Sequence, residues 1–124
     1  VLPADVPIKD AIFNAKRLGM FIQAVNTKDS ELMKFALQDR LHQPYRMKLV
    51  PGLSSIIENL KHFDNVLGCV LSGAGSSILI ISEKSNLDKI RNVVKETWAE
   101  QNIKCEIRTL PIENNGVQII NNED

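Results

Sequence analysis

A short glycine-containing loop is the feature of the sequence that best suits chemistry. Residues 71–77 read Leu-Ser-Gly-Ala-Gly-Ser-Ser. Glycines with small neighbours let the backbone approach a ligand closely and point successive N–H groups into a concavity, which can hold a phosphate or a carboxylate. The loop is not a Walker A motif, because no Gly-Lys-Ser/Thr follows it. Taken alone, it is also explained by a tight turn that needs positive φ angles.

A second candidate is the polar run at residues 39–46, Asp-Arg-Leu-His-Gln-Pro-Tyr-Arg. Arg46 could bind a substrate carboxylate through two parallel hydrogen bonds, or it could be a surface arginine paired with Asp39. His42 is a candidate general base that has no candidate nucleophile nearby, and His62 suits a helix end, where a cation is favourable. None of the serines lies in a G-x-S-x-G elbow, so no catalytic residue is assigned.

The two cysteines do not indicate redox or metal chemistry. Cys69 and Cys105 both lie in apolar, strand-like surroundings, so we expect small buried hydrophobes rather than a disulfide or a catalytic thiol. Together with the two histidines they could supply four ligands, but no C-x-x-C or H-x-x-x-H pair is present. No metal site is therefore expected.

The composition fits one globular domain and argues against some classes of binding partner. The chain has 124 residues, 15 basic and 15 acidic, and 44% are hydrophobic, which suffices for a core. The net charge is zero, so the chain lacks the excess of basic residues that nucleic-acid binding requires. No apolar run approaches the roughly 20 residues that span a bilayer, and the first residues lack a signal-peptide pattern. We therefore expect no nucleic acid or membrane partner and a cytoplasmic location.

The first half of the chain is predicted to be helical. Pro7 suits the first turn of a helix at residues 7–26, and Asp29 or Ser30 can cap a second helix. Pro44 should end helical continuation, which makes residues 39–52 a turn-rich connector. The first helix carries one continuous apolar stripe, formed by Ile8, Ile12, Ala15, Leu18, Ile22 and Val25. Four further apolar residues widen the stripe, so more than one side of the helix should be covered: Ala11, Phe13, Phe21 and Ala24.

The second half is predicted to alternate helices and strands. Ser55 and Glu58 form a capping box for a helix at residues 56–63, and residues 66–71 and 77–81 are short β-branched runs that should pair antiparallel. A further helix follows Asn86, with Leu87, Ile90, Val94 and Trp98 on its buried face. Ile103, Cys105 and Ile107 then alternate with charged residues, which predicts a strand with one wet face, and a last short strand is expected at residues 117–120.

This order favours an α+β fold. Helices, two strands, a helix and a strand suggest an antiparallel sheet with helices packed on one face, a ferredoxin-like α/β sandwich whose first strand is missing. The chain begins at Val1 without an initiator Met, so we expect a fragment of a longer protein. Unpaired strand edges favour pairing between chains, which predicts a dimer.

Three segments together resemble a known family. The runs LPADVPIKDAIFNAKR, DRLHQPYR and LSGAGSSILII, in this order, resemble the C-terminal half of the homoserine kinase family, within the GHMP small-molecule kinase superfamily. The resemblance covers nearly the whole chain. It implies that residues 1–124 are a single GHMP kinase C-terminal domain of a longer two-domain kinase. It also implies transfer of the ATP γ-phosphate, with Mg²⁺, to the hydroxyl of L-homoserine in threonine biosynthesis, by an enzyme that we expect to be a homodimer.

The resemblance also implies roles for residues at both candidate features. Ser72, Gly73, Ala74 and Gly75 match the third superfamily motif, a loop beside the substrate and the phosphates, and Gly73 would contact substrate. Ser76 stands where the family usually has proline. Arg46 matches an arginine that clamps the amino-acid carboxylate. The family's nucleotide motif, P-x-x-x-G-L-G-S-S, is absent from the chain, so ATP and Mg²⁺ would be bound mainly elsewhere in the kinase and the isolated chain should be inactive.

Two other functions fit the same residues. Another GHMP kinase, acting on mevalonate, a sugar or shikimate, would share the glycine loop, although Arg46 favours a carboxylated substrate. A ferredoxin-like module that senses an amino acid without chemistry, or that only dimerises, would share the fold. The sequence upstream of Val1 would distinguish a kinase from a module, because only the kinase needs the nucleotide motif there.

Overall fold

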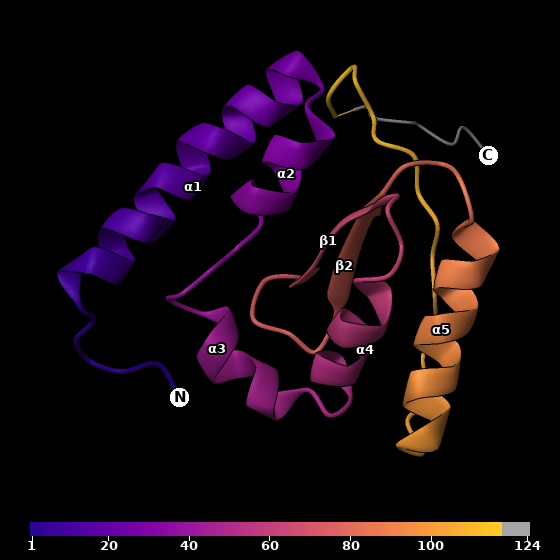
Figure 1. Cartoon of the computed structure of the whole chain (residues 1–124). Helices are drawn as coiled ribbons and strands as arrows, with labels where there is room; N and C mark the ends of the chain where they lie inside the picture. The colour runs from indigo at the N-terminus through magenta and orange to yellow at the C-terminus, as the bar shows by residue number, and fades with distance from the viewer. Residues whose placement is uncertain (118–124) are drawn as a thin grey trace, which may run out of the picture.

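The computed structural model describes residues 1–117, which form an α+β fold (Figure 1). This confirms the predicted fold class. Two helices and a connector come first, and a helix, a β-hairpin and a final helix follow. The elements are α1 (Ile8–Thr27), α2 (Ser30–Ala36), α3 (Gln43–Arg46), a 3₁₀ turn at Met47–Leu49, α4 (Leu53–Leu60), β1 (Val66–Leu71), β2 (Ile78–Ser82) and α5 (Leu87–Glu100).

The hairpin is the two-stranded antiparallel sheet that the sequence predicts. Cys69 lies opposite Ile80 and Leu71 opposite Ile78, with one irregularity in register near the start of β1. The loop between the strands is closed by the Ser72 N–H, which donates to the Ser77 carbonyl at 2.9 Å. Residues on a strand alternate between faces, so these paired side chains share one face of the sheet.

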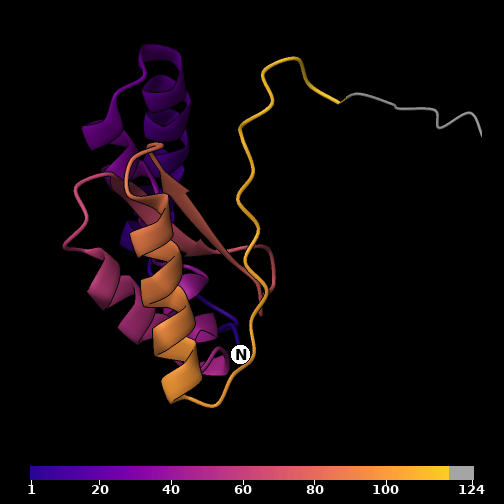
Figure 2. The same cartoon turned by 90° about the vertical axis from the view of Figure 1, so that its right-hand side faces the viewer.

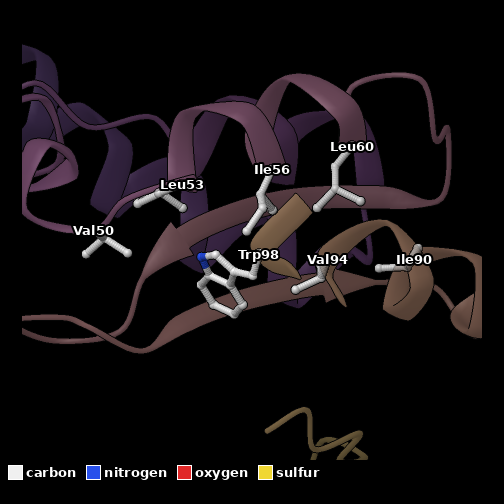
Figure 3. Close-up of a cluster of buried hydrophobic side chains, with 7 residues drawn as sticks. All are labelled: Val50, Leu53, Ile56, Leu60, Ile90, Val94 and Trp98. Carbon is white, nitrogen blue, oxygen red and sulfur yellow. The ribbon is translucent and has the colours of Figure 1, made fainter. Parts of the chain in front are cut away.

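The hydrophobic core lies between that face and helices α4 and α5 (Figure 3). Both helices carry apolar residues at three- and four-residue spacing, which places them on one side of each helix. The side chains of Cys69, Leu71, Ile78 and Ile80 pack against this cluster from the sheet. The buried cluster consists of Val50, Leu53, Ile56, Leu60, Ile90, Val94 and Trp98.

Helices α1 and α2 form a separate layer (Figure 1). The Asp29 carboxylate caps α2 by accepting from the Leu32 N–H at 2.9 Å, as predicted. Leu37, the residue that follows α2, contacts Gly68 on β1. Gly68 lies on the side of the sheet that faces away from the core. A layer order of α4 and α5, hairpin, then α2 and α1 results.

The strongest apolar stripe of the sequence lies on the uncovered side of α1. Ile8 is 79% exposed, Leu18 65% and Ile22 54%, whereas Ala24 is buried on the side that faces α2. Within residues 1–117 the helix is therefore covered on one side only, contrary to the expectation of wider cover. Although α1 is long, neither it nor another helix in the described part of the chain meets the length and apolarity needed to cross a bilayer.

The strand predicted around Cys105 does not form. Residues 101–117 leave the end of α5 as an extended segment without strand pairing (Figure 2). The predicted alternation is real, because Ile103, Cys105 and Ile107 pack against the core. The segment is therefore attached by its side chains, without a hydrogen-bonded ladder. The strand expected at 117–120 falls largely outside the described residues.

Two helix starts also differ from prediction. Pro44 lies in the first turn of α3 instead of ending a helix, which is favourable because first-turn N–H groups need no intrahelical partner. Helix α4 begins at Leu53 after Gly52, whose φ is 79°, so Ser55 is inside the helix and forms no capping box. Glu58 instead pairs with Lys61 at 2.5 Å. Asn86 precedes α5 as predicted but makes no side-chain cap.

Candidate functional site

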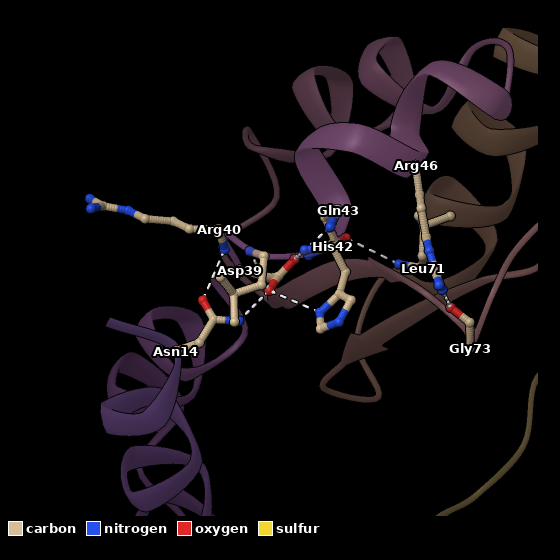
Figure 4. A network of polar contacts seen from close by, with 9 residues as sticks. Asn14, Asp39, Arg40, His42, Gln43, Arg46, Leu71 and Gly73 are labelled. Atoms are coloured by element: carbon tan, nitrogen blue, oxygen red, sulfur yellow. Dashed lines mark hydrogen bonds and ion pairs between the residues drawn. The ribbon is translucent and has the colours of Figure 1, made fainter. Parts of the chain in front are cut away.

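The structure brings Arg46 and the glycine loop together. The Arg46 guanidinium donates from Nη1 to the Gly73 carbonyl oxygen at 3.3 Å, although the two residues are 27 apart in sequence (Figure 4). Arg46 ends α3 and Gly73 lies just beyond β1, so packing of the connector against the hairpin creates the contact. A guanidinium carries five N–H donors in a fixed plane, and this contact uses one of them.

The loop is a tight turn with positive φ angles at both glycines, as its residue types predict. Gly73 and Gly75 have φ angles of 61° and 89°, which residues with a Cβ adopt rarely. The Gly75 N–H donates to the Ser72 carbonyl at 3.3 Å, while within residues 1–117 the N–H groups of Gly73 and Ala74 donate no hydrogen bond. These two donors lie at the exposed tip of the hairpin, beside Arg46.

Asp39 is not the partner of Arg46, so that alternative is wrong. Its carboxylate accepts from the backbone N–H groups of Leu41 at 3.1 Å, His42 at 2.8 Å and Gln43 at 2.5 Å, and from the Asn14 amide. Partial burial by itself raises the pKa of Asp39, but the hydrogen bonds, that from the Gln43 N–H first, lower it to about 2. Asp39 is thus an ionised structural group within the connector.

Gln43 is the contributor that the sequence did not single out for the site. Its side-chain oxygen Oε1 accepts from the Leu71 N–H at 3.1 Å (Figure 4). This contact joins α3 to the last residue of β1, immediately before the loop. The sequence offered two signals, its place in the polar run and its match in the family resemblance, which suggested that its side chain shapes the connector. Neither identifies a partner 28 residues away.

The remaining candidates do not gather around the loop. His42 Nδ1 lies 3.6 Å from Asp39 Oδ1, and its side chain is more than half exposed; His62 is exposed beyond α4. The cysteines are free, and burial raises the pKa of Cys69 to about 11, which suits a packed thiol. In the chain up to residue 117, no three His, Cys, Asp or Glu residues cluster as metal ligands would.

Comparison with known proteins assigns the chain to a kinase domain family. Residues 21–100 match the family model described as GHMP kinases C terminal, and the chain belongs to this family. Relatives that it resembles include homoserine kinases. That of Persephonella marina is 36% identical over 119 residues, 96% of this chain, and that of Aquifex aeolicus is 38% identical over 120 residues, also 96% of this chain.

A solved structure supports the same assignment. The crystal structure of homoserine kinase from Cytophaga hutchinsonii is similar with a TM-score of 0.76 and 25% sequence identity, over 84% of this chain and 33% of that protein. The resemblance predicted from the three sequence segments is thereby confirmed. The chain spans 39% of the Persephonella marina relative and 40% of the Aquifex aeolicus relative.

Proposed function

We propose that this chain forms one wall of the substrate site in a homoserine kinase, which transfers the γ-phosphate of ATP to the hydroxyl of L-homoserine. The observation that carries the proposal is the Arg46 contact with Gly73 beside the unpaired loop N–H groups. Its relatives' names supply the substrate, and the chemistry of the two features suits it. A guanidinium fixes a carboxylate in position and plane.

Each residue has a distinct part in this proposal. Arg46 would hold the carboxylate of homoserine, and Gly73 would line the substrate beside it. Ser72, Ala74 and Gly75 would keep the loop close to the transferring phosphate, where the Gly73 and Ala74 N–H groups face negative charge. Phosphoryl transfer depends mainly on positioning and on charge stabilisation, so no general base is required from this wall.

ATP and Mg²⁺ would be held mainly outside this chain. The basis for this is the family's nucleotide motif, P-x-x-x-G-L-G-S-S, which does not occur in residues 1–124. By its resemblance to homoserine kinases, the chain would be the C-terminal domain of a two-domain kinase, and it would not turn over alone. The uncovered apolar side of α1 supports a neighbouring domain, because large exposed apolar patches mark interfaces.

Assembly and location complete the proposal. A homodimer is supported by the short two-stranded sheet, since unpaired strand edges invite pairing with another chain. The kinase would work in the cytoplasm. Sedimentation of the whole kinase tests the first point, and a monomer at all concentrations would contradict it.

The decisive experiment measures KM for homoserine in the whole kinase with Arg46→Ala and Arg46→Lys. Loss of a charge-assisted pair should raise KM roughly 10- to 100-fold in Arg46→Ala, with partial recovery in Arg46→Lys. Arg108→Ala is the matched control, because Arg108 is exposed and pairs only with Glu106 within the described residues. An unchanged KM in Arg46→Ala would refute the clamp.

A substrate panel separates the alternatives. Activity on a different carboxylated alcohol, with none on homoserine, would assign the chain to another GHMP kinase. Binding of homoserine by the whole protein without phosphorylation would instead support an amino-acid-sensing module. Either outcome would overturn the proposed reaction while leaving the family assignment intact.

A further inference from the structure

We infer that Asp39 and Gln43 are positioning residues, which set the place of the Arg46 guanidinium relative to the glycine loop. This inference rests on the proposed role of Arg46. It concerns a chain of hydrogen bonds that begins on α1, passes through the connector and ends at the loop (Figure 4). Neither Asp39 nor Gln43 needs to touch substrate for this role.

The first link is the turn that Asp39 organises. Its side chain is only 16% exposed, and it accepts three successive backbone N–H groups, those of residues 41–43. A carboxylate bonded in this way fixes the direction in which the chain enters α3. A helix of four residues gains little stability from its own hydrogen bonds, so its placement depends on such external contacts.

The second link joins this turn to α1. Asn14 donates its side-chain amide to the Asp39 carboxylate, and its Oδ1 accepts from the Arg40 N–H at 3.0 Å. The Arg40 side chain also pairs with Asp10 at 3.2 Å and lies over the Phe13 ring, 3.8 Å from its centre. The connector is thus attached to a 20-residue helix at several points.

The third link reaches the loop from α3. Gln43 and Arg46 are three residues apart on this helix, which places them on the same side. The Gln43 oxygen holds the Leu71 N–H at 3.1 Å, and Arg46 holds the Gly73 carbonyl at 3.3 Å. Two contacts two residues apart in the hairpin fix both the distance and the rotation of α3.

The Gln43 and Arg46 contacts have different roles, and this difference is the basis of the inference. If Gln43 did not hold Leu71, the Arg46 contact would be the remaining hydrogen bond between α3 and the loop region. Arg46 would then serve as the tether and could not turn freely toward a carboxylate. By holding the helix itself, Gln43 leaves the guanidinium available to substrate.

The test compares Gln43→Met, which keeps the size but lacks an acceptor, with Gln43→Glu, which keeps one. The first readout is hydrogen exchange of the Leu71 amide in this chain. We expect protection to fall about tenfold in Gln43→Met and to be retained in Gln43→Glu. Gln23→Met is the control, because Gln23 is an exposed glutamine on α1. Equal protection in Gln43→Met and the parent chain would overturn the inference.

The second readout is kinetic and uses the whole kinase. Gln43→Met should raise KM for homoserine about three- to tenfold with little change in kcat, while the thermal midpoint stays near that of Gln23→Met. An unchanged KM in Gln43→Met, together with a raised KM in Arg46→Ala, would overturn the positioning role but leave the proposed function standing. An unchanged KM in both variants, with Leu71 deprotected in Gln43→Met, would refute the Arg46 clamp and leave only the structural tether.

Discussion

The indole of Trp98 donates its Nε1–H to the carbonyl oxygen of Pro51 at 3.0 Å. This bond joins α5 to the turn that precedes α4, next to the buried cluster. Trp98→Phe should lower the free energy of unfolding by about 1–3 kcal/mol, because the carbonyl loses its partner and the core loses volume. Urea denaturation followed by circular dichroism measures this. Lys95→Ala, at an exposed position of the same helix, should change little, and equal midpoints for both variants would contradict the prediction.

Close contact between α2 and the sheet makes Gly68 sensitive to substitution. A Cβ at Gly68 would overlap Cδ1 of Leu37 and would lie 3.1 Å from its Cβ. Gly68→Ala should therefore cost about 1–3 kcal/mol through overpacking, and Leu37→Ala should relieve part of that cost in the double variant.

Gly19 supplies the matched control for this glycine. A Cβ there meets no atom within 4 Å, and the residue lies inside α1. Gly19→Ala should stabilise the chain by up to about 1 kcal/mol, since alanine favours helix. Similar denaturation midpoints for Gly68→Ala and Gly19→Ala would contradict a close contact between Leu37 and Gly68.

Acid should weaken the connector through Asp39. Its pKa in the folded chain, about 2, lies below the ordinary value of 3.8, so the unfolded chain binds the proton more readily. The stabilisation is complete above about pH 4 and is lost as the pH falls through 2, and its size is at most about 2 kcal/mol. Asp39→Asn should flatten the pH dependence of unfolding between about pH 4 and 2. Asp5→Asn, at an exposed position, should leave that dependence in place, and a profile unchanged by Asp39→Asn would refute the assignment.

The bare side of α1 should make the isolated chain associate with itself. Ile22→Lys places a charge on the uncovered stripe, where the native side chain is 54% exposed, so folding should be unaffected and association weakened. Sedimentation velocity over a range of concentrations measures this. Gln23→Lys adds the same charge at the neighbouring position. Equal association in both variants would exclude the stripe as the contact surface.

The two features that meet at the candidate site, Arg46 and the glycine loop, could be chosen from the sequence because their possible chemistry depends on residue type. An arginine can bind a carboxylate and a glycine-rich loop can approach a ligand closely in many folds. The family resemblance implied that Arg46 and Gly73 both line the substrate. The tether through Gln43 was not predictable in this way. An amide oxygen can accept from any nearby N–H, and only the three-dimensional path of the connector brings that of Leu71 to it.

The fold was predictable where local signals agreed and unpredictable where burial decided. The hairpin and α5 followed from turn residues and periodicity. Helix α4 began earlier than its Ser55 box suggested, because starting after Gly52 buries Leu53 in the core. A stripe such as that of α1 shows which residues share a side, but not which of two apolar sides is covered. The alternation around Cys105 likewise indicated which side chains face the core, but it did not indicate whether a neighbouring strand is present to form hydrogen bonds.

The hydrophobic core contains no side chain from α1 or α2 among its described members. These two helices reach the rest of the chain through Leu37 at Gly68 and through polar contacts, which include Ser30 with Glu83, Asn14 with Asp39, and Asp10 with Arg40. Such a pair can open at a smaller free energy than the core requires to unfold. We therefore expect α1 and α2 to open more readily than the half that carries the loop, which would place Arg46 at the boundary between two units of different stability.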